Sequence, residues 1–200
     1  DEMQGRMTGE KGQKLAAEYL RNFYQDNGIA SPIEKNNYYQ TIPAEYFSRI
    51  EAIQFALSHD DGQSTWDLED ADAILLGVSR TSKTPTSIYL ANRGIKTANI
   101  PIVPGCPVSE EIFNTQKPLV IGLTKDPKRL IEIRRQRLRI LNQDENTDYI
   151  DPEMVSKEIN DARRLFSKYD WPVINVSRKS IEETAATILQ LFNTRQEQHP

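Results

Sequence analysis

Apolar residues recur three or four positions apart in the first part of the chain. Between residues 10 and 26 this spacing predicts an amphipathic helix, and Asn27-Gly28 supplies a stop. The next stretch, to residue 43, is rich in Asn, Ser, Pro and Tyr and predicts a connecting loop. A second helix is expected over residues 44–58, ending at the polar turn His59-Asp60-Asp61-Gly62.

Beyond residue 65 short apolar runs alternate with helical periods. The runs expected as buried strands are residues 73–78, 98–103, 120–123 and 173–176. The helices expected among them are residues 83–93, 109–113, 127–141, 152–169 and 181–192. Strands that alternate with helices are typical of a parallel sheet covered by helices, so the expected fold class is α/β.

The first expected strand leads directly into a phosphate-binding pattern. The run Gly77-Val-Ser-Arg-Thr-Ser-Lys-Thr84 fits GxxxxGK[ST] except that Ser82 replaces the second glycine, which we expect to be tolerated at negative φ. Backbone N–H groups of such a loop and the following helix N-terminus converge on phosphate oxygens. Lys83 is expected to neutralise a terminal phosphate, and the Thr84 hydroxyl to bind Mg²⁺. The residues expected to bind the nucleotide phosphates are Gly77, Val78, Ser79, Arg80, Thr81, Ser82, Lys83 and Thr84.

Arginines add positive charge near this loop. Arg80 lies inside it, where a guanidinium could stabilise developing charge. Residues 130–139 carry four arginines on one expected helix, and Arg134 should lie at the edge of its buried stripe. Two interpretations of this helix stay open: a clamp for phosphates with Arg134 in the binding site, or an ordinary solvated amphipathic helix.

A carboxylate for the metal or for proton transfer must come from outside the strands. Asp72 precedes its strand and so lies at the wrong edge of the sheet. The acidic turn offers Asp60 and Asp61, and either could act as catalytic base or hold the metal. Paired acids beside a glycine are also a common helix stop, and both interpretations stay open.

The last expected strand and helix resemble those of small P-loop kinases of the shikimate and nucleoside-monophosphate type. Ser180 and Glu183 have the spacing of a capping box at the start of that helix. The preceding residues 177–179 should lie at the carboxyl edge of the sheet, where ligands bind in open α/β folds. They either bind a nucleotide base or only precede a capped surface helix.

Composition excludes several classes of function. The net charge of −4 argues against nucleic acid as a partner. The only cysteine, Cys106, and the two distant histidines form no metal-binding pattern, which favours a reducing, cytoplasmic setting. No apolar run approaches the roughly 20 residues of a membrane span, and the polar start without methionine is typical of a fragment.

Six runs carry a resemblance to a known family: residues 46–56, 59–62, 77–94, 121–124, 130–138 and 179–185. Together they resemble the pyruvate, phosphate dikinase regulatory protein family, over about residues 45–191. A sister branch acts on phosphoenolpyruvate synthase, and the spellings Arg80-Thr81-Ser82 and Asn92-Arg93-Gly94 look more like the dikinase branch. Family members carry a further N-terminal α/β domain, so residues 1–43 are expected to be a remnant of the interdomain region and residues 44–200 the P-loop kinase-like catalytic domain.

The resemblance implies a bifunctional enzyme, expected as a homodimer. With ADP as donor it phosphorylates a threonine beside the phosphorylated catalytic histidine of the dikinase, and with inorganic phosphate as co-substrate it removes that group as pyrophosphate. Asp60 or Asp61 would then be the base, with Arg80 or Arg134 stabilising charge at the β-phosphoryl group that Lys83 holds. The alternatives are an ATP-dependent small-molecule kinase and a nucleotide-binding switch without catalysis.

Overall fold

The computed structural model describes residues 11–29, 44–64 and 66–198, and the chain divides into two units, Asp1–Pro43 and Ala44–Pro200. The first unit contains helix α1 (Lys11–Asp26), which confirms the first expected helix from its second residue onward. Asn27 closes this helix through a hydrogen bond from its backbone N–H to the carbonyl of Phe23 (3.1 Å). Most of the expected loop, residues 30–43, lies outside the described residues.

The second unit confirms the α/β class. Within the described residues its four parallel strands have the order β2-β1-β3-β4. The strands are β1 (Ala73–Gly77), β2 (Thr97–Pro101), β3 (Leu119–Thr124) and β4 (Val173–Asn175). The helices are α2 (Ala44–Ser58), α3 (Lys83–Ala91), α4 (Glu111–Asn114), α5 (Pro127–Ile140), α6 (Pro152–Lys168) and α7 (Ile181–Gln198), with single 3-10 turns at η1 (Asp60–Gly62) and η2 (Leu68–Asp70). None of the helices that the structure describes has the length and apolar character needed to cross a membrane.

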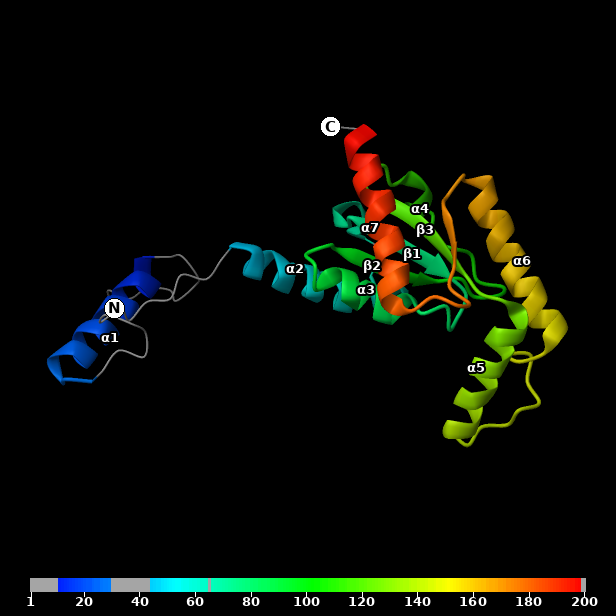
Figure 1. The fold of residues 1–200 in the computed structure, drawn as a ribbon, viewed down its shortest axis with the longest axis horizontal. Helices are drawn as coiled ribbons and strands as arrows, with labels where there is room; N and C mark the ends of the chain where they lie inside the picture. Colours follow the sequence, from blue (N-terminus) through cyan, green and yellow to red (C-terminus); the bar gives the residue numbers. More distant parts are fainter. Residues whose placement is uncertain (1–10, 30–43, 65, 199–200) are drawn as a thin grey trace. The chain divides into compact units, whose positions relative to one another are not determined.

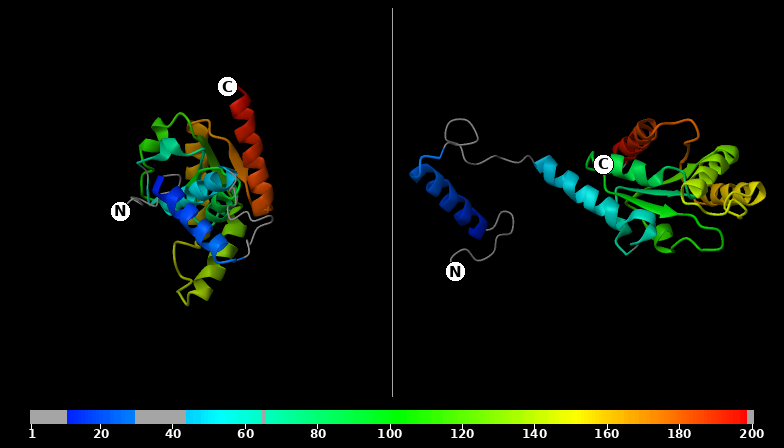
Figure 2. Two further views of the ribbon diagram at one scale, coloured as in Figure 1. Left: turned by 90° about the vertical axis from the view of Figure 1, so that its left-hand side faces the viewer. Right: turned by 90° about the horizontal axis from the view of Figure 1, so that it is seen from below.

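Helices cover both faces of the sheet (Figures 1 and 2). Ile74 and Leu76 of β1 point into a core closed by α6, where Phe166 is fully buried. Leu75, on the opposite face, joins a core formed with α3 and α7 that includes Ile188. Alternate residues of one strand thus supply two cores, as a strand buried on both faces requires.

The central strands approach their neighbours closely at two glycines. A Cβ on Gly122 of β3 would overlap the Phe166 ring, and one on Gly77 would lie 2.6 Å from the Leu123 carbonyl oxygen. Both contacts are closer than real Cβ atoms allow. Gly122 therefore lets α6 lie against the sheet, and Gly77 lets the loop after β1 pass beside β3.

Side-chain caps fix where the helices begin. Asp126 and Asp151 accept hydrogen bonds from the first turns of α5 and α6, and a proline follows each of them. The capping box of α7 is confirmed: the Ser180 N–H donates to Glu183 Oε2 (2.8 Å), and the Glu183 N–H donates to Ser180 Oγ (3.1 Å).

Several elements differ from expectation at their ends. Strand β2 ends at Pro101 rather than at residue 103, α3 ends at Ala91 rather than at residue 93, and α4 spans Glu111–Asn114 rather than residues 109–113. Strand β4 ends at Asn175 and exposes Val173 and Asn175, because it is an edge strand rather than one buried on both faces. Helix α7 continues past residue 192, where Arg195 donates to the carbonyls of Pro118 and Gln116 (both 2.6 Å). These contacts anchor the added turns to the segment that precedes β3.

Candidate functional site

Two residues other than glycine have a positive φ in the loop between β1 and α3. Arg80 (φ 72°) and Ser82 (φ 65°) both lie in the left-handed region. The expectation that Ser82 keeps a negative φ is therefore wrong: the serine adopts the conformation for which glycine is suited, at a cost of about 1–2 kcal/mol. The Ser82 carbonyl still accepts the first bond of α3, from the N–H of Thr86 (3.2 Å).

Cationic side chains bind three successive carbonyls of this loop. The pairs are Val78 with Lys83 (3.2 Å), Ser79 with Arg134 (3.3 Å) and Arg80 with Lys125 (3.0 Å). The C=O and N–H of a trans peptide point in opposite directions, so each cation directs the N–H of the next residue away from itself. The three N–H groups are those of residues 79–81, and successive N–H groups of this kind can bind an anion where they converge.

Lys83 is nearly buried, with 5% of its surface exposed. Burial lowers the pKa of Lys83 to about 8, although the carboxylates of Asp61 and Asp60 partly offset the effect. The ammonium group is therefore charged at neutral pH but held in a poorly solvated place. A phosphate bound at the loop would stabilise the Lys83 ammonium group with its negative charge, in place of the water that burial excludes.

Asp60, Thr84 and Asn99 form a cluster of oxygens at the start of α3. Thr84 Oγ1 donates to Asp60 Oδ1 (2.9 Å), and the amide of Asn99 donates to both Asp60 and Thr84. Asn99 Oδ1 is buried and has no hydrogen-bond partner in the described part of the chain. A carboxylate, a hydroxyl and an unpartnered amide oxygen are hard ligands that suit Mg²⁺ beside a phosphate. The described residues hold no group of three or more His, Cys, Asp or Glu that could bind a metal without such help.

The two aspartates of the acidic turn are placed differently. Asp60 is half-buried and bound to Thr84, whereas Asp61 is exposed and has a positive φ of 51°. His59 holds the turn against the sheet: its ring bonds the Phe55 carbonyl (2.8 Å) and Asp67 (2.6 Å), and its own carbonyl accepts the N–H of Asn99 (3.0 Å). The turn is thus a fixed part of the site as well as a helix stop.

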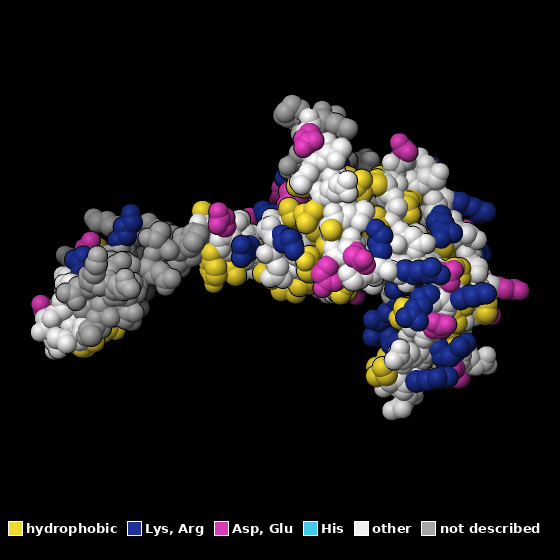
Figure 3. All heavy atoms as spheres, viewed as in Figure 1, with side chains coloured by type: hydrophobic (Ala, Val, Ile, Leu, Met, Phe, Trp, Pro, Cys, Tyr) yellow, Lys and Arg dark blue, Asp and Glu magenta, His cyan; other side chains and the backbone are white. Residues whose placement is uncertain are grey.

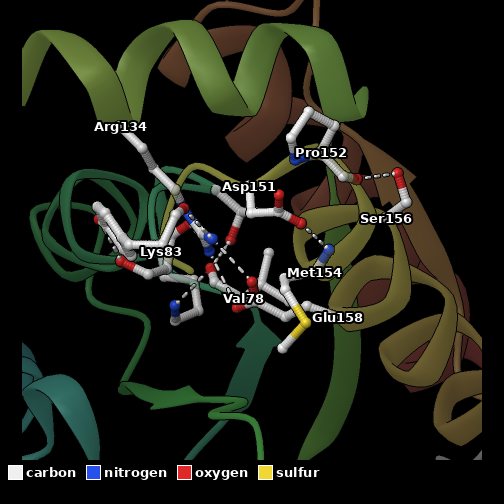
Figure 4. Close-up of polar contacts among 11 residues, drawn as sticks. Val78, Lys83, Arg134, Asp151, Pro152, Met154, Ser156 and Glu158 are labelled. Atoms are coloured by element: carbon white, nitrogen blue, oxygen red, sulfur yellow. Dashed lines mark hydrogen bonds and ion pairs between the residues drawn. The ribbon is translucent and has the colours of Figure 1, made fainter. Parts of the chain in front are cut away.

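Arg134 is buried and binds three neighbouring segments, and does not lie at the edge of the buried stripe of α5. Its guanidinium forms two bonds with Glu158 of α6 (2.7 and 2.9 Å) and a third with the Tyr149 carbonyl (3.1 Å), in addition to the bond with Ser79. Only 1% of Arg134 is exposed, so its expected place at the edge of the buried stripe is wrong. Figure 4 shows it reaching from α5 toward Lys83 and Val78. In this arrangement Arg134 positions the loop.

The other arginines of α5 lie on the surface, where Lys and Arg side chains gather (Figure 3). Arg135 and Arg139 pair with Glu145 at 3.5 and 2.7 Å. The helix is therefore a solvated surface helix along most of its length, with one residue turned inward. Arg80 keeps a buried Nε that has no partner among the described residues, which leaves this donor for a ligand.

A hollow of 790 Å³ lies at the carboxyl ends of β3 and β4. Its polar lining consists of Asp126, Lys128, Arg129, Glu132, Asn175, Ser177, Arg178 and Lys179, and we call it the charged hollow. The Asp126 N–H donates to Ser177 Oγ (2.7 Å), which ties the two strand ends together. Residues 177–179 therefore lie at the expected edge of the sheet.

Sequence reasoning missed Lys125, Asn99 and Glu158. The sequence offered a hint for the first two. Lys125 directly follows the carboxyl end of a buried strand, and Asn99 is a polar residue within a mostly apolar strand. It offered none for Glu158, because the role of this residue depends on Arg134, which lies 24 positions away.

Comparison with known proteins supports the same kind of chemistry. The family model described as "Kinase/pyrophosphorylase" matches residues 12–189. Three relatives, each named as a pyruvate, phosphate dikinase regulatory protein, are similar to this chain. That of Paramagnetospirillum magneticum is 59% identical over 151 residues, which are 76% of this chain and 49% of the relative. Those of Bradyrhizobium diazoefficiens and Novosphingobium aromaticivorans are 52% and 57% identical, over 78% and 75% of this chain and 57% and 54% of the relatives. The chain thus spans about half the length of these curated relatives.

Proposed function

Because the chain belongs to the kinase/pyrophosphorylase family, we propose that it is the catalytic part of a phosphotransferase that regulates pyruvate, phosphate dikinase in both directions. In one direction it transfers the β-phosphoryl group of ADP to a threonine of the dikinase and releases AMP. In the other, inorganic phosphate attacks the phosphothreonine and leaves as pyrophosphate. The observation that carries the proposal is the loop of residues 77–84, in which three carbonyls are bound by cationic side chains, one of them the buried Lys83.

In this proposal the loop holds the phosphoryl group that moves. Its N–H groups and Lys83 bind the oxygens of the β-phosphate, and the free Nε of Arg80 adds a donor where charge develops. The charged hollow beside β3 and β4 takes the remainder of ADP, because Lys128, Arg129 and residues 177–179 lie there. Arg134 acts through the loop rather than on the phosphate.

Asp60 and Asp61 have different roles in this proposal. Asp60 and Thr84, with Asn99 beside them, would hold Mg²⁺, which would supply positive charge to the phosphates of the donor. Asp61 is exposed and free of the Thr84 cluster, and it takes the proton of the threonine hydroxyl as the oxygen bonds to phosphorus. The bond from phosphorus to the bridging oxygen breaks in line, so AMP leaves on the opposite side.

One site serves both reactions in this account. Inorganic phosphate occupies the subsite that the β-phosphate of ADP uses, and the same donors stabilise either transition state. We further propose that the protein works as a homodimer in the cytoplasm, without nucleic acid or membrane as a partner. The net charge of −4 supports the absence of a nucleic-acid partner.

The test offers labelled ADP and ATP in parallel to histidine-phosphorylated dikinase, with the full-length protein. We expect phosphothreonine from ADP alone, and none with Lys83→Ala. Label that arrives only from ATP would contradict the proposal and favour a conventional kinase. Nucleotide binding without any label would favour a switch without catalysis.

A further inference from the structure

A second hollow, which we call the apolar groove, includes Ser79 of the loop in its lining. Its volume is 660 Å³, and it runs between one face of α6 and residues 101–106, which begin at the last residue of β2. Ser79 and Glu158 line its inner end, so it opens directly onto the phosphate-binding loop. Figure 4 shows Met154 and Glu158 of α6 on the side that faces Val78 and Lys83.

We propose that the apolar groove binds an extended segment of the protein that accepts the phosphoryl group, with the acceptor hydroxyl placed at Ser79. This inference rests on the proposed function and adds the place where the protein substrate docks. One wall of the groove comes from the end of β2, whereas the charged hollow lies at the ends of β3 and β4, and β1 separates these strands in the sheet order β2-β1-β3-β4. In-line transfer needs the donor and the acceptor to approach one phosphorus atom from opposite sides, and two separate hollows suit that need.

The lining identifies the kind of acceptor. Val103 and Met154 are 47% and 41% exposed, and Ile102 and Leu165 extend the same apolar surface. A small polar metabolite would leave such side chains unmatched, whereas apolar side chains on either side of an acceptor residue would cover them. Lys157 and Asp161 are further lining residues, and each can pair with a charge or hydrogen-bonding group of a polypeptide.

One wall of the groove is formed before any partner binds. The run Val103-Pro104-Gly105-Cys106 is a tight turn, closed by a hydrogen bond from the Cys106 N–H to the Val103 carbonyl (3.1 Å). Gly105 has a φ of 77°, which a turn with proline before glycine requires. A rigid wall reduces the entropy that is lost when a flexible segment docks.

The first experiment measures steady-state kinetics of Val103→Glu and Met154→Glu in the full-length protein. Both positions are already exposed, so a carboxylate there does not disturb the core. We expect the KM for the dikinase to rise about tenfold or more, while the Kd for ADP stays within about twofold. Ile140→Glu is the control, since Ile140 is 73% exposed and lies outside the groove at the end of α5. An unchanged KM in the two groove variants would overturn the proposal.

The second experiment uses Cys106, the only cysteine of the chain, as a reporter inside the groove. Its alkylation by iodoacetamide is followed by mass spectrometry in Asp61→Asn, which lacks the proposed base but keeps Lys83 and the loop for ADP. We expect the dikinase to slow this alkylation at least about fivefold, and ADP alone to leave the rate unchanged. Protection by ADP alone would show a nucleotide site instead, and protection that grows with the concentration of the chain itself would show self-association; either overturns the inference.

These readouts separate the inference from the proposed function. If the wild-type protein makes no phosphothreonine from ADP, the proposed function fails, whatever the groove does. If it makes phosphothreonine while Cys106 stays equally reactive with and without the dikinase, the groove proposal alone fails.

Discussion

At the scale of single residues, Ser82 carries a backbone strain that the phosphate-binding loop imposes. Its φ of 65° is suited to glycine, and its side chain makes no capping bond in return. Ser82→Gly should raise the free energy of unfolding by about 0.5–1 kcal/mol, because removing Cβ relieves more strain than the added chain entropy costs. Denaturant unfolding measures the change. Ser79→Gly, at a position without positive φ, should lower stability by a similar amount; a gain there too would contradict the explanation.

Lys83 predicts a pH dependence of nucleotide binding. Its pKa of about 8 in the free protein must rise when a phosphate binds, because the anion favours the charged form. The Kd for ADP should thus be constant below pH 8 and increase by up to about tenfold per pH unit above it. Calorimetry between pH 6.5 and 9.5 measures this. Lys83→Arg should show no such increase, because the guanidinium stays charged, and a wild-type Kd that is constant across the range would refute the assignment.

The same burial predicts a cost to stability. A lysine whose folded pKa is below its unfolded value binds fewer protons in the folded state between pH 8 and 10.5, so stability should rise with pH in that window. Lys83→Met removes the buried charge. It should raise the free energy of unfolding at pH 7 by about 1–3 kcal/mol while abolishing ADP binding, measured by denaturant unfolding and calorimetry. Equal or lower stability would mean that the bond from Lys83 to Val78 outweighs the cost of burial.

At the scale of elements, the ion pair of Arg134 and Glu158 joins α5, α6 and the phosphate-binding loop. Glu158→Gln would leave a buried guanidinium without its counter-charge, and should cost about 3–5 kcal/mol of stability. Glu132→Gln, which breaks the exposed pair with Arg129, is the matched control and should cost less than about 1 kcal/mol. Thermal and denaturant unfolding compare the two. Similar losses would show that the buried pair does not hold the elements together.

Patterns within a few consecutive residues predicted most of the helices and strands. The features that were missed depend on contacts between residues far apart in the sequence. The strands, the capping box at Ser180 and the phosphate-binding pattern each occupy a few consecutive residues, so periodicity and spacing reveal them. The burial of the Arg134 side chain cannot be predicted from the sequence of its own helix, because its partners lie on α6 and in the loop. The contact between Asn99 and Asp60 spans 39 positions and likewise has no local signature.

At the scale of the whole molecule, the site links ligand binding to global stability. A ligand that binds only the folded state stabilises it by about 2.7 kcal/mol at one hundred times its Kd. For a chain of 200 residues this corresponds to a rise in Tm of about 5–10 °C. We expect ADP with Mg²⁺ to produce this shift in a thermal melt, and Asp60→Asn to reduce the part that depends on Mg²⁺. A shift that is the same with and without Mg²⁺ would contradict the oxygen cluster as a metal site.

The position of Asp60 in the chain decides how much of the protein must be copied to move the proposed site into another protein. The loop and its helix could be copied into another parallel sheet as a strand, a turn and a helix, but the carboxylate that contacts Thr84 belongs to a segment that precedes β1. A graft that begins at Ala73 would bring the loop without the carboxylate that we propose as a metal ligand. The smallest portable unit of the proposed site therefore begins at α2, whose end presents the acidic turn to β2.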